Sequence, residues 1–307
     1  MARGLRDLRR KMKAIRATRQ VTKAMELVSA SKMRRAVQNA QQLRRYTLAS
    51  WDILQRAASL HPDLHLSFAE RPVKNVLVIL FSSDRGLAGS LNTGLFRMAG
   101  KYLRELRQMP GFASVDFIAV GRKGQQYLAR TGQRVIAAFP AFSNAPSFRE
   151  IRPVVKLASQ SFVDKKYDHV VLLYADFVSA LLQEPTMKVL LPFSRSVLKE
   201  MVATMVPHKK TVLSDTSDDP HTKQYLFEPS PQGVADAIIP LITEVQVYQA
   251  LLEAVASEHS ARMVAMRSAT DNASGILDDL TLTYNQTRQA SITAELAELS
   301  ASKAALE

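Results

Sequence analysis

Prolines are absent from both ends of the chain. All 13 lie between Pro62 and Pro240, so the 61 residues before them and the 67 residues after them contain none. Each of these two flanks also holds a single glycine, Gly4 in the first and Gly275 in the second. Proline removes a backbone donor and clashes with the preceding turn of a helix, so long helices are disfavoured where prolines occur. Each flank is therefore predicted to be a single, very long helix.

Apolar side chains in both flanks recur every three or four residues, which is the period of a helix face. In the first flank the series is Leu5, Leu8, Met12, Ile15, Val21, Met25, Val28, Met33, Val37, Ala40 and Leu43. In the second flank it is Val245, Tyr248, Leu252, Val255, Met266, Ala273, Leu277, Leu280, Tyr284, Leu296 and Leu299. The second series has the spacing of a coiled-coil seam.

Helices of this length would extend about 80 and 100 Å at about 1.5 Å per residue, which is longer than a compact domain. We therefore expect the two helices to pair with each other, in antiparallel orientation because both leave one central segment. Small or polar residues interrupt the seam and predict loose packing there. These residues are Thr18, Thr22, His259, Thr270 and Thr287.

Short β-branched runs alternate with helical stretches between the flanks, which indicates βαβ units. The predicted strands are 74–81, 115–120, 134–139, 169–174 and 188–192, and the predicted helices are 91–107, 123–130 and 147–163. Near-continuous apolar strands are typical of a sheet covered on both faces. Residues 207–224 are polar and turn-rich, so we expect an exposed loop or hairpin there, followed by a last strand at 225–228.

The predicted fold class is therefore α/β, a long antiparallel coiled coil of the N- and C-terminal helices plus a central Rossmann-like α/β domain. The predicted domains are an N-terminal shaft helix at 1–61, the central domain at 62–230 and a C-terminal shaft helix at 231–307. Pro229, Pro231 and Gly233 mark the expected start of that last helix.

The net charge of +13 is concentrated in the first flank. Residues 1–61 carry 15 Lys or Arg against three acids, a net charge of +12, whereas residues 241–307 carry four against nine, a net charge of −5. The two predicted helices should attract each other and leave a basic surplus. A basic helix suits nucleic acid, an anionic membrane surface or an acidic protein partner, and composition does not choose among the three.

The chain contains no cysteine, which excludes disulfides, thiolate metal sites and sulfur redox chemistry within it and fits a reducing compartment. The longest aliphatic or aromatic runs, such as residues 76–81, are far shorter than the ~18 residues of a membrane-spanning helix, so we expect no membrane-spanning helix.

The Arg-rich N-terminal segment resembles a mitochondrial targeting peptide. Because its pattern continues unbroken for about 40 further residues, we interpret it as mature structure.

A glycine-rich turn follows the first predicted strand, where α/β folds often hold phosphate. It runs from Ser82 to Asn92 and contains Asp84, Arg85, Gly86 and Gly89. Its spacing is not that of a dinucleotide or P-loop motif, because Gly94 is followed by Leu95 and Phe96 rather than by Lys-Ser or Lys-Thr. We therefore interpret it as a structural turn that caps the next helix. Residues 121–124, Gly-Arg-Lys-Gly, are interpreted in the same way, as a solvated turn.

The remaining polar residues suggest no enzyme site. The six histidines are scattered and no HExxH motif occurs, so metal binding is not expected. Asp278 and Asp279 are adjacent, which sends their side chains in different directions and gives no acid–base pair. We expect no catalytic, cofactor-binding or metal-binding residue in this chain.

Five segments carry a family resemblance. Near the N-terminus, residues 8–15 read LRRKMKAI and residues 18–33 read TRQVTKAMELVSASKM. Near the C-terminus, residues 257–273 read SEHSARMVAMRSATDNA and residues 279–296 read DLTLTYNQTRQASITAEL. The central element is SDRGLAGSLN at residues 83–92. Together they resemble the gamma subunit of rotary, proton-translocating ATP synthases. The chain departs from that pattern at Ala88, where the family often has cysteine, and at Ser302-Lys303, where it usually has Gly-Ala.

The resemblance implies a rotor subunit of the central stalk that couples transmembrane proton flow to ATP synthesis or hydrolysis and is required for assembly. The paired helices would turn inside a ring of three alpha and three beta subunits, which bind Mg-ATP or Mg-ADP and phosphate and perform the chemistry. The residues carried over as ring contacts are Lys23, Met25, Arg288, Gln289, Thr293 and Glu295. Further implied partners are the epsilon and delta subunits and the membrane c-ring, with the protein peripheral on the cytoplasmic face of a bacterial membrane rather than in the mitochondrial matrix.

Two other functions remain open at the level of the residues. A basic coiled-coil adaptor could bind nucleic acid through residues 1–61, although the flank interleaves only Tyr46 and Trp51 with its basic side chains. An α/β enzyme with helical arms is disfavoured by the lack of a recognisable site.

Overall fold

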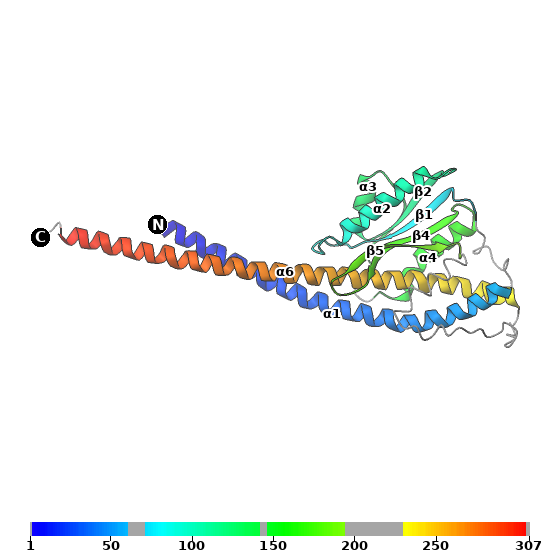
Figure 1. Cartoon of the computed structure of the whole chain (residues 1–307), viewed down its shortest axis with the longest axis horizontal. Coiled ribbons are helices and arrows are strands. Elements are labelled where there is room, and N and C mark those ends of the chain that lie inside the picture. Colours follow the sequence, from blue (N-terminus) through cyan, green and yellow to red (C-terminus); the bar gives the residue numbers. More distant parts are fainter. Residues whose placement is uncertain (1, 61–70, 142–145, 194–229, 305–307) are drawn as a thin grey trace. The chain divides into compact units, whose positions relative to one another are not determined.

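The computed structural model describes residues 2–60, 71–141, 146–193 and 230–304. In chain order the elements are α1 (Ala2–Leu60), β1 (Asn75–Phe81), α2 (Leu91–Gln108), β2 (Ser114–Val120), α3 (Arg122–Arg130), β3 (Arg134–Phe139), α4 (Phe148–Val163), β4 (His169–Phe177), β5 (Gln183–Leu191) and α6 (Pro231–Ala304) (Figure 1). They form two compact units. The helical unit comprises Met1–Ser31 and Arg262–Glu307, and the sheet unit comprises Lys32–Ala261. The two long helices contribute to both units, and the division into domains at 61 and 230 stays a prediction.

The sheet unit contains a five-stranded sheet in the order β3-β2-β1-β4-β5. Strand β1 pairs in parallel with β2 and with β4, and β3 pairs in parallel with β2. Strand β5 forms an antiparallel hairpin with β4. This arrangement confirms the predicted α/β class. The predicted loop at 207–224 and strand at 225–228 lie outside the described residues.

Both faces of the sheet are covered, as the apolar strands predicted. Along β1, Leu77, Ile79 and Phe81 belong to one buried cluster, and Val76, Val78 and Leu80 belong to the other. The first cluster is completed by side chains of α4 and α6, and the second by side chains of α2 and α3. Successive side chains of a strand point to opposite faces, so one apolar run supplies both cores.

Two prolines lie inside helices that were predicted to run across them. Pro153 lies inside α4 and Pro240 inside α6. Helix α6 begins at Pro231, at the first helical position, where the missing N–H would have no partner in any case. The predicted start of α6 is therefore correct. The predicted helices at 147–163 and 231–307 already contained Pro153 and Pro240, and burial of each helix offsets the one hydrogen bond that its proline removes.

One stretch of α6 is long and apolar enough to cross a membrane by length and composition alone. Of that stretch, 61% is buried inside the protein. Ile242, Val247 and Leu251, for example, belong to the core beneath the sheet. The apolar character of α6 is therefore that of a core helix.

In the helical unit, α1 and α6 run antiparallel, as predicted. Arg9 Nε donates to the hydroxyl of Tyr284 at 2.8 Å, and Thr270 Oγ1 donates to Thr22 Oγ1 at 2.8 Å. Residue numbers thus rise along α1 while they fall along α6. Figure 1 shows the first turns of α1, in blue, beside the orange and red end of α6.

The seam between these two helix segments buries few large side chains. Its buried residues include Met12, Thr22, Ser29, Met266, Ala273, Leu277 and Ser291. Several apolar residues of the helical unit are exposed instead, namely Val21, Leu27, Val28, Ile276, Leu282, Ile292, Leu296 and Leu299. Each of two paired helices can bury only a narrow stripe of the other's surface. The predicted seam therefore contained more apolar residues than the pair can bury. Of its predicted members, Val21, Val28, Leu296 and Leu299 are exposed.

Four tyrosines of the sheet unit, two of them buried and two half-buried, lead us to expect that it loses stability in alkali. Burial raises the pKa of Tyr102 to about 12 and raises the pKa values of Tyr167, Tyr174 and Tyr248 above the ordinary value. A group whose folded pKa is raised stabilises the fold fully below its unfolded pKa, about 10 for tyrosine, and that stability is lost as the pH rises through the folded pKa. We expect the free energy of unfolding to decline above pH ~10. Tyrosinate absorbance and circular dichroism, followed together, test this. Full ionisation near pH 10 in a folded chain would contradict it.

Candidate functional site

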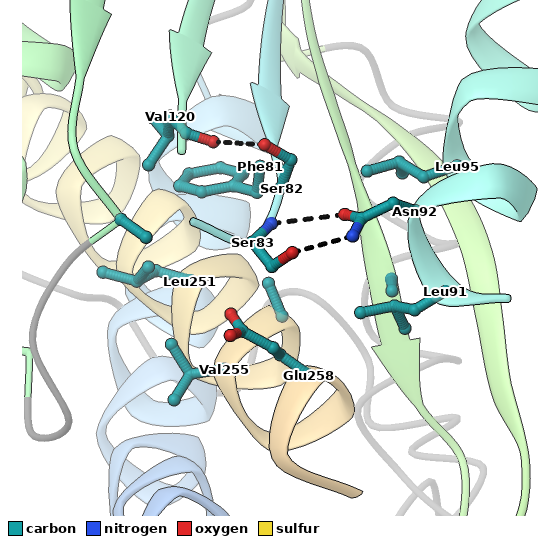
Figure 2. Close-up of a pocket in the computed structure, with 13 residues that line it drawn as sticks. Phe81, Ser82, Ser83, Leu91, Asn92, Leu95, Val120, Leu251, Val255 and Glu258 are labelled. Carbon is teal, nitrogen blue, oxygen red and sulfur yellow. Dashed lines mark hydrogen bonds between the residues drawn. The ribbon is translucent and has the colours of Figure 1, made fainter. Parts of the chain in front are cut away.

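The crevice beside the carboxyl end of β1 is the place where a sheet of this topology usually binds ligands. Strand β2 lies on one side of β1 and strand β4 lies on the other, so the strand order reverses at β1. Open α/β sheets bind their ligands at the point where the strand order reverses. Here the crevice is a cavity of about 30 Å³. Its lining residues include Phe81, Ser82, Ser83, Leu91, Asn92, Leu95, Val120, Leu251, Val255 and Glu258 (Figure 2).

Helix α6 occupies the space that a ligand would need in this crevice. Figure 2 shows Leu251, Val255 and Glu258 of α6 beneath the turn that follows β1. A cavity of about 30 Å³ holds a water molecule or two, whereas small-molecule sites measure about 300–1,000 Å³. The crevice of this arrangement therefore does not accommodate a nucleotide.

Hydrogen bonds of the turn after β1 connect the ends of three neighbouring strands. Asp84 Oδ1 accepts hydrogen bonds from the backbone N–H of Arg122 at 2.9 Å and of Ala141 at 3.0 Å. Ser82 Oγ donates to the carbonyl of Val120 at 3.0 Å and accepts from the N–H of Gly124 at 2.8 Å. These bonds connect β1 with the segments after β2 and β3, so the motif has a structural role here.

The predicted cap of α2 is only partly correct. Ser90 occupies the N-cap position, but its side chain makes no capping hydrogen bond. Asn92 instead bonds back to the turn, since Ser83 N donates to its Oδ1 at 3.3 Å and its Nδ2 donates to Ser83 Oγ at 2.7 Å (Figure 2). Of the other motif residues, Arg85 is exposed, Gly86 is exposed, and Gly89 is exposed with φ +56°. Gly89 thus adopts a left-handed conformation that favours glycine.

Asp84→Ala is expected to destabilise the sheet unit by about 2 kcal/mol, because it leaves two backbone N–H groups without their charged acceptor. Asp84→Asn keeps an oxygen in the same place and should recover part of that loss. Urea unfolding of the full chain measures both. The matched control is Arg85→Ala, which removes an exposed side chain one position away and should change little. Equal losses for Asp84→Ala and Arg85→Ala would refute the structural role.

The predicted ring contacts lie in the helical unit, where most of them are exposed. Lys23 is exposed and pairs with Glu26 on its own helix at 3.0 Å, and Met25 is half-buried. The α6 members, Arg288, Gln289, Thr293 and Glu295, are all exposed. Within α6, Ser291 Oγ lies 3.4 Å from Glu295 Oε1.

The structure does not bring these contacts together in one site. Thr22, next to Lys23, lies opposite Thr270. Arg288 lies 18 positions further along α6 than Thr270, which corresponds to ~27 Å at about 1.5 Å per residue. The α1 and α6 residues therefore form two separate levels along the helix pair.

The end of α6 extends beyond α1. Because Arg9 lies opposite Tyr284, the first residues of α1 lie opposite about position 291 of α6. Beyond that point Ile292, Leu296 and Leu299 are 49%, 59% and 68% exposed. The α6 segment past α1, with these three side chains, is called the α6 tip below. Leu296 and Leu299 were predicted to lie in the seam, although the second flank is longer than the first and therefore extends beyond it.

Metal ligands do not cluster in the part of the chain that the structure describes. Within it, no group of three or more His, Asp or Glu residues could hold a metal ion. The expectation that the chain holds no cofactor of its own stays a prediction.

Comparison with protein families and curated proteins gives consistent results. The ATP synthase family model, whose description reads "ATP synthase", matches residues 4–306. The ATP synthase gamma chain of Roseiflexus castenholzii is 39% identical over 306 residues, covering 98% of each chain. The ATP synthase gamma chain of Opitutus terrae is 40% identical over 299 residues, covering 97% of each.

Solved structures share the fold. A chain of the Euglena gracilis mitochondrial ATP synthase, from a cryo-EM structure of its OSCP, F1 and c-ring, superimposes with a TM-score of 0.67 at 21% identity, covering 100% of this chain and 95% of that one. A chain from the central stalk and c-ring structure of the Tetrahymena thermophila enzyme gives a TM-score of 0.56 at 24% identity, covering 81% and 99%. Nothing in these comparisons supports a nucleic-acid-binding adaptor. With relatives near 40% identity along almost its whole length, this chain belongs to the ATP synthase gamma chain family.

Proposed function

We propose that this chain is the central-stalk rotor subunit of an ATP synthase, which couples transmembrane proton flow to ATP synthesis or hydrolysis at the beta subunits by rotation and is required for assembly. The observation that carries the proposal is the α6 tip, a helix end that presents Ile292, Leu296 and Leu299 to solvent without an α1 neighbour. Apolar side chains gathered in this way mark a surface that a partner covers. A ring of three alpha and three beta subunits around the tip would supply that cover.

The charge of the helical unit fits the same partner. Residues 1–31 carry nine Lys or Arg against Asp7 and Glu26, a net charge of +7. Acidic loops of the ring would face this surface, and electrostatic contacts can guide a moving partner without a deep, fixed lock. In this proposal Lys23 and Met25 contact the ring at one level, and Arg288, Gln289, Thr293 and Glu295 contact it at the other.

The chemistry is assigned to the partner subunits, so this chain is a non-catalytic subunit. Membership of the gamma chain family implies that Mg-ATP, Mg-ADP and phosphate would bind the alpha and beta subunits. In this chain, helix α6 fills the crevice where a sheet of this kind would hold a nucleotide. Further partners would be the epsilon and delta subunits and the membrane c-ring. Contact with the membrane would occur only through the rotor, on the cytoplasmic face of a bacterial cell membrane, which agrees with the bacterial origin of the curated relatives.

Assembly tests the proposal directly. The chain is expected to co-purify with alpha and beta subunits and to restore ATP hydrolysis that is coupled to proton pumping in membranes lacking their own gamma subunit. The nucleic-acid alternative predicts the opposite result, recovery of the chain with nucleic acid and without alpha or beta subunits. That second result would overturn the proposal.

Arg288→Glu is expected to reduce ATP-driven proton pumping about tenfold, because it places a negative charge opposite the acidic ring surface. The chain should still fold, since Arg288 is exposed in the helical unit. Pumping in reconstituted vesicles gives the measurement. Arg104→Glu is the matched control, because Arg104 is also exposed and lies on α2 of the sheet unit. Unchanged pumping in the Arg288 variant would count against the assigned contact.

A further inference from the structure

Arg9 of α1 and Tyr284 of α6 meet across the seam of the helical unit in two ways. Arg9 Nε donates to the hydroxyl of Tyr284 at 2.8 Å, and Arg9 Nη2 donates to the same oxygen. The guanidinium carbon also lies 5.3 Å from the centre of the Tyr284 ring. A planar guanidinium group can donate two hydrogen bonds in one direction while it contacts an aromatic ring, and an ammonium group cannot reproduce this geometry. The contact therefore requires arginine rather than positive charge alone.

Apolar packing near this contact is weak. The buried apolar side chain of α1 nearest to it is Met12, and Leu8, the next apolar residue toward the N-terminus, is only half-buried. Among the described residues of α6, the last buried apolar side chain is Leu277, seven positions before Tyr284. Hydrogen bonds from a charged donor are stronger than those between neutral groups. The pairing of the helices at this end therefore depends largely on Arg9.

The contact lies close to the free end of the pair. The bond between Thr270 and Thr22 joins the helices 14 positions earlier along α6, which corresponds to ~21 Å at about 1.5 Å per residue. Beyond Arg9, α1 continues toward its N-terminus for only about two turns. Terminal turns with few buried contacts are the segments that open first. A contact at this place decides whether α1 stays paired along its whole length.

Tyr284 also lies one turn before Arg288 on the same face of α6, because residues four positions apart on a helix are neighbours. Arg288 is one of the proposed ring contacts, whereas Arg9 and Tyr284 are not. A force applied to α6 at the level of Arg288 reaches α1 by the shortest route through Tyr284 and Arg9.

We propose that Arg9 and Tyr284 are positioning residues that close the free end of the helix pair, so that α1 and α6 move as one body at the level of Arg288. The closure of the pair is a property of the chain itself. The transfer of force between the helices rests on the rotor function proposed above, and each part has its own test.

Hydrogen exchange of the full chain tests the closure. Tyr284→Phe removes only the accepting oxygen and keeps the ring, so it should raise the exchange rates of the α1 amides at 6–15 about tenfold. Arg9→Lys keeps the charge but loses the paired donors, and it should have a similar effect. Arg10→Lys, the same substitution at the neighbouring exposed position, is the matched control and should leave the rates unchanged. Unchanged rates in the Tyr284→Phe chain would overturn the closure.

The double variant, with Arg9→Lys and Tyr284→Phe together, shows whether the two residues act through each other. If they do, its exchange rates should equal those of either single variant, because one contact can be lost only once. Multiplied effects, with exchange about a hundredfold faster, would show that each residue acts alone and would contradict the proposed pairing.

Proton pumping by the assembled complex tests the transfer of force. Tyr284→Phe and Arg9→Lys should each lower ATP-driven pumping about fivefold relative to the ATP hydrolysis measured in the same vesicles. A role in folding or assembly alone would lower pumping and hydrolysis together, and an unchanged ratio would overturn the transfer of force. If the unaltered chain does not assemble with alpha and beta subunits, the rotor function fails and the transfer of force falls with it, whereas the exchange experiment still decides the closure.

Discussion

Gly121→Ala is expected to unfold the sheet unit, with a loss of more than about 4 kcal/mol in the free energy of unfolding. Gly121 follows β2 with φ +95°, and an added Cβ would lie 2.1 Å from the backbone oxygen of Ser82. Neither partner can move easily. The N–H of Gly121 donates to Phe139 O at 2.9 Å, and the N–H of Ser82 donates to Val120 O at 2.8 Å. The free energy of unfolding of a folded domain is only about 5–15 kcal/mol, so this one methyl group removes much of the stability of the sheet unit.

Gly132→Ala is the matched control for the backbone conformation. Gly132 also has a positive φ, +64°, but an added Cβ would meet nothing within 4 Å. Its replacement should therefore cost only the ~1–2 kcal/mol of a left-handed alanine. Urea unfolding of the full chain, followed by circular dichroism, compares the two variants. Similar losses for both would show that the close approach to Ser82 is not what requires glycine.

Replacing the three apolar residues of the α6 tip with serine is expected to loosen the assembled complex severely. The residues are Ile292, Leu296 and Leu299, all exposed in the isolated chain. Full burial of such a side chain is worth about 1.5–3 kcal/mol, so the triple variant could lose several kilocalories per mole of binding free energy. The chain itself should fold normally, because these side chains contribute little to its own core.

The measurement is the temperature at which the complex with alpha and beta subunits dissociates. Leu181→Ser is the control, since Leu181 is 81% exposed and lies in the sheet unit, between β4 and β5. The triple variant should dissociate at a clearly lower temperature and the control at that of the unaltered complex. Equal dissociation temperatures would mean that no partner covers the α6 tip.

The strands and the helix pair were predictable because each has a strong periodic signal. Strand β1 begins one residue later than predicted and ends where predicted, since its apolar run is continuous. Strand β5 begins at Gln183, five residues before the predicted start, because Gln183, Glu184 and Pro185 do not look like a strand. Their pairing with β4 comes from the hairpin and the rest of the sheet, which local sequence does not contain.

The roles of individual polar residues were less predictable. The turn after β1 was correctly interpreted as structural, but the bonds of Asp84 to Arg122 and Ala141 join positions 38 and 57 residues apart. No local pattern reveals such contacts. The exposure of the α6 tip was not predictable either, because it depends on the register of the two helices. The contact of Arg9 with Tyr284 defines that register.

The sparse seam of the helical unit has a consequence for its dynamics. Among the described residues of that unit, the buried apolar side chains are Met12, Met266, Ala273 and Leu277, whereas the sheet unit has two extensive cores. Segments with few buried apolar contacts open locally at a small fraction of the global free energy of unfolding. In the free chain, the helical unit should therefore exchange its amide hydrogens long before β1 does. An enclosing partner would slow that exchange, so part of the binding energy of assembly is used to order the helix pair.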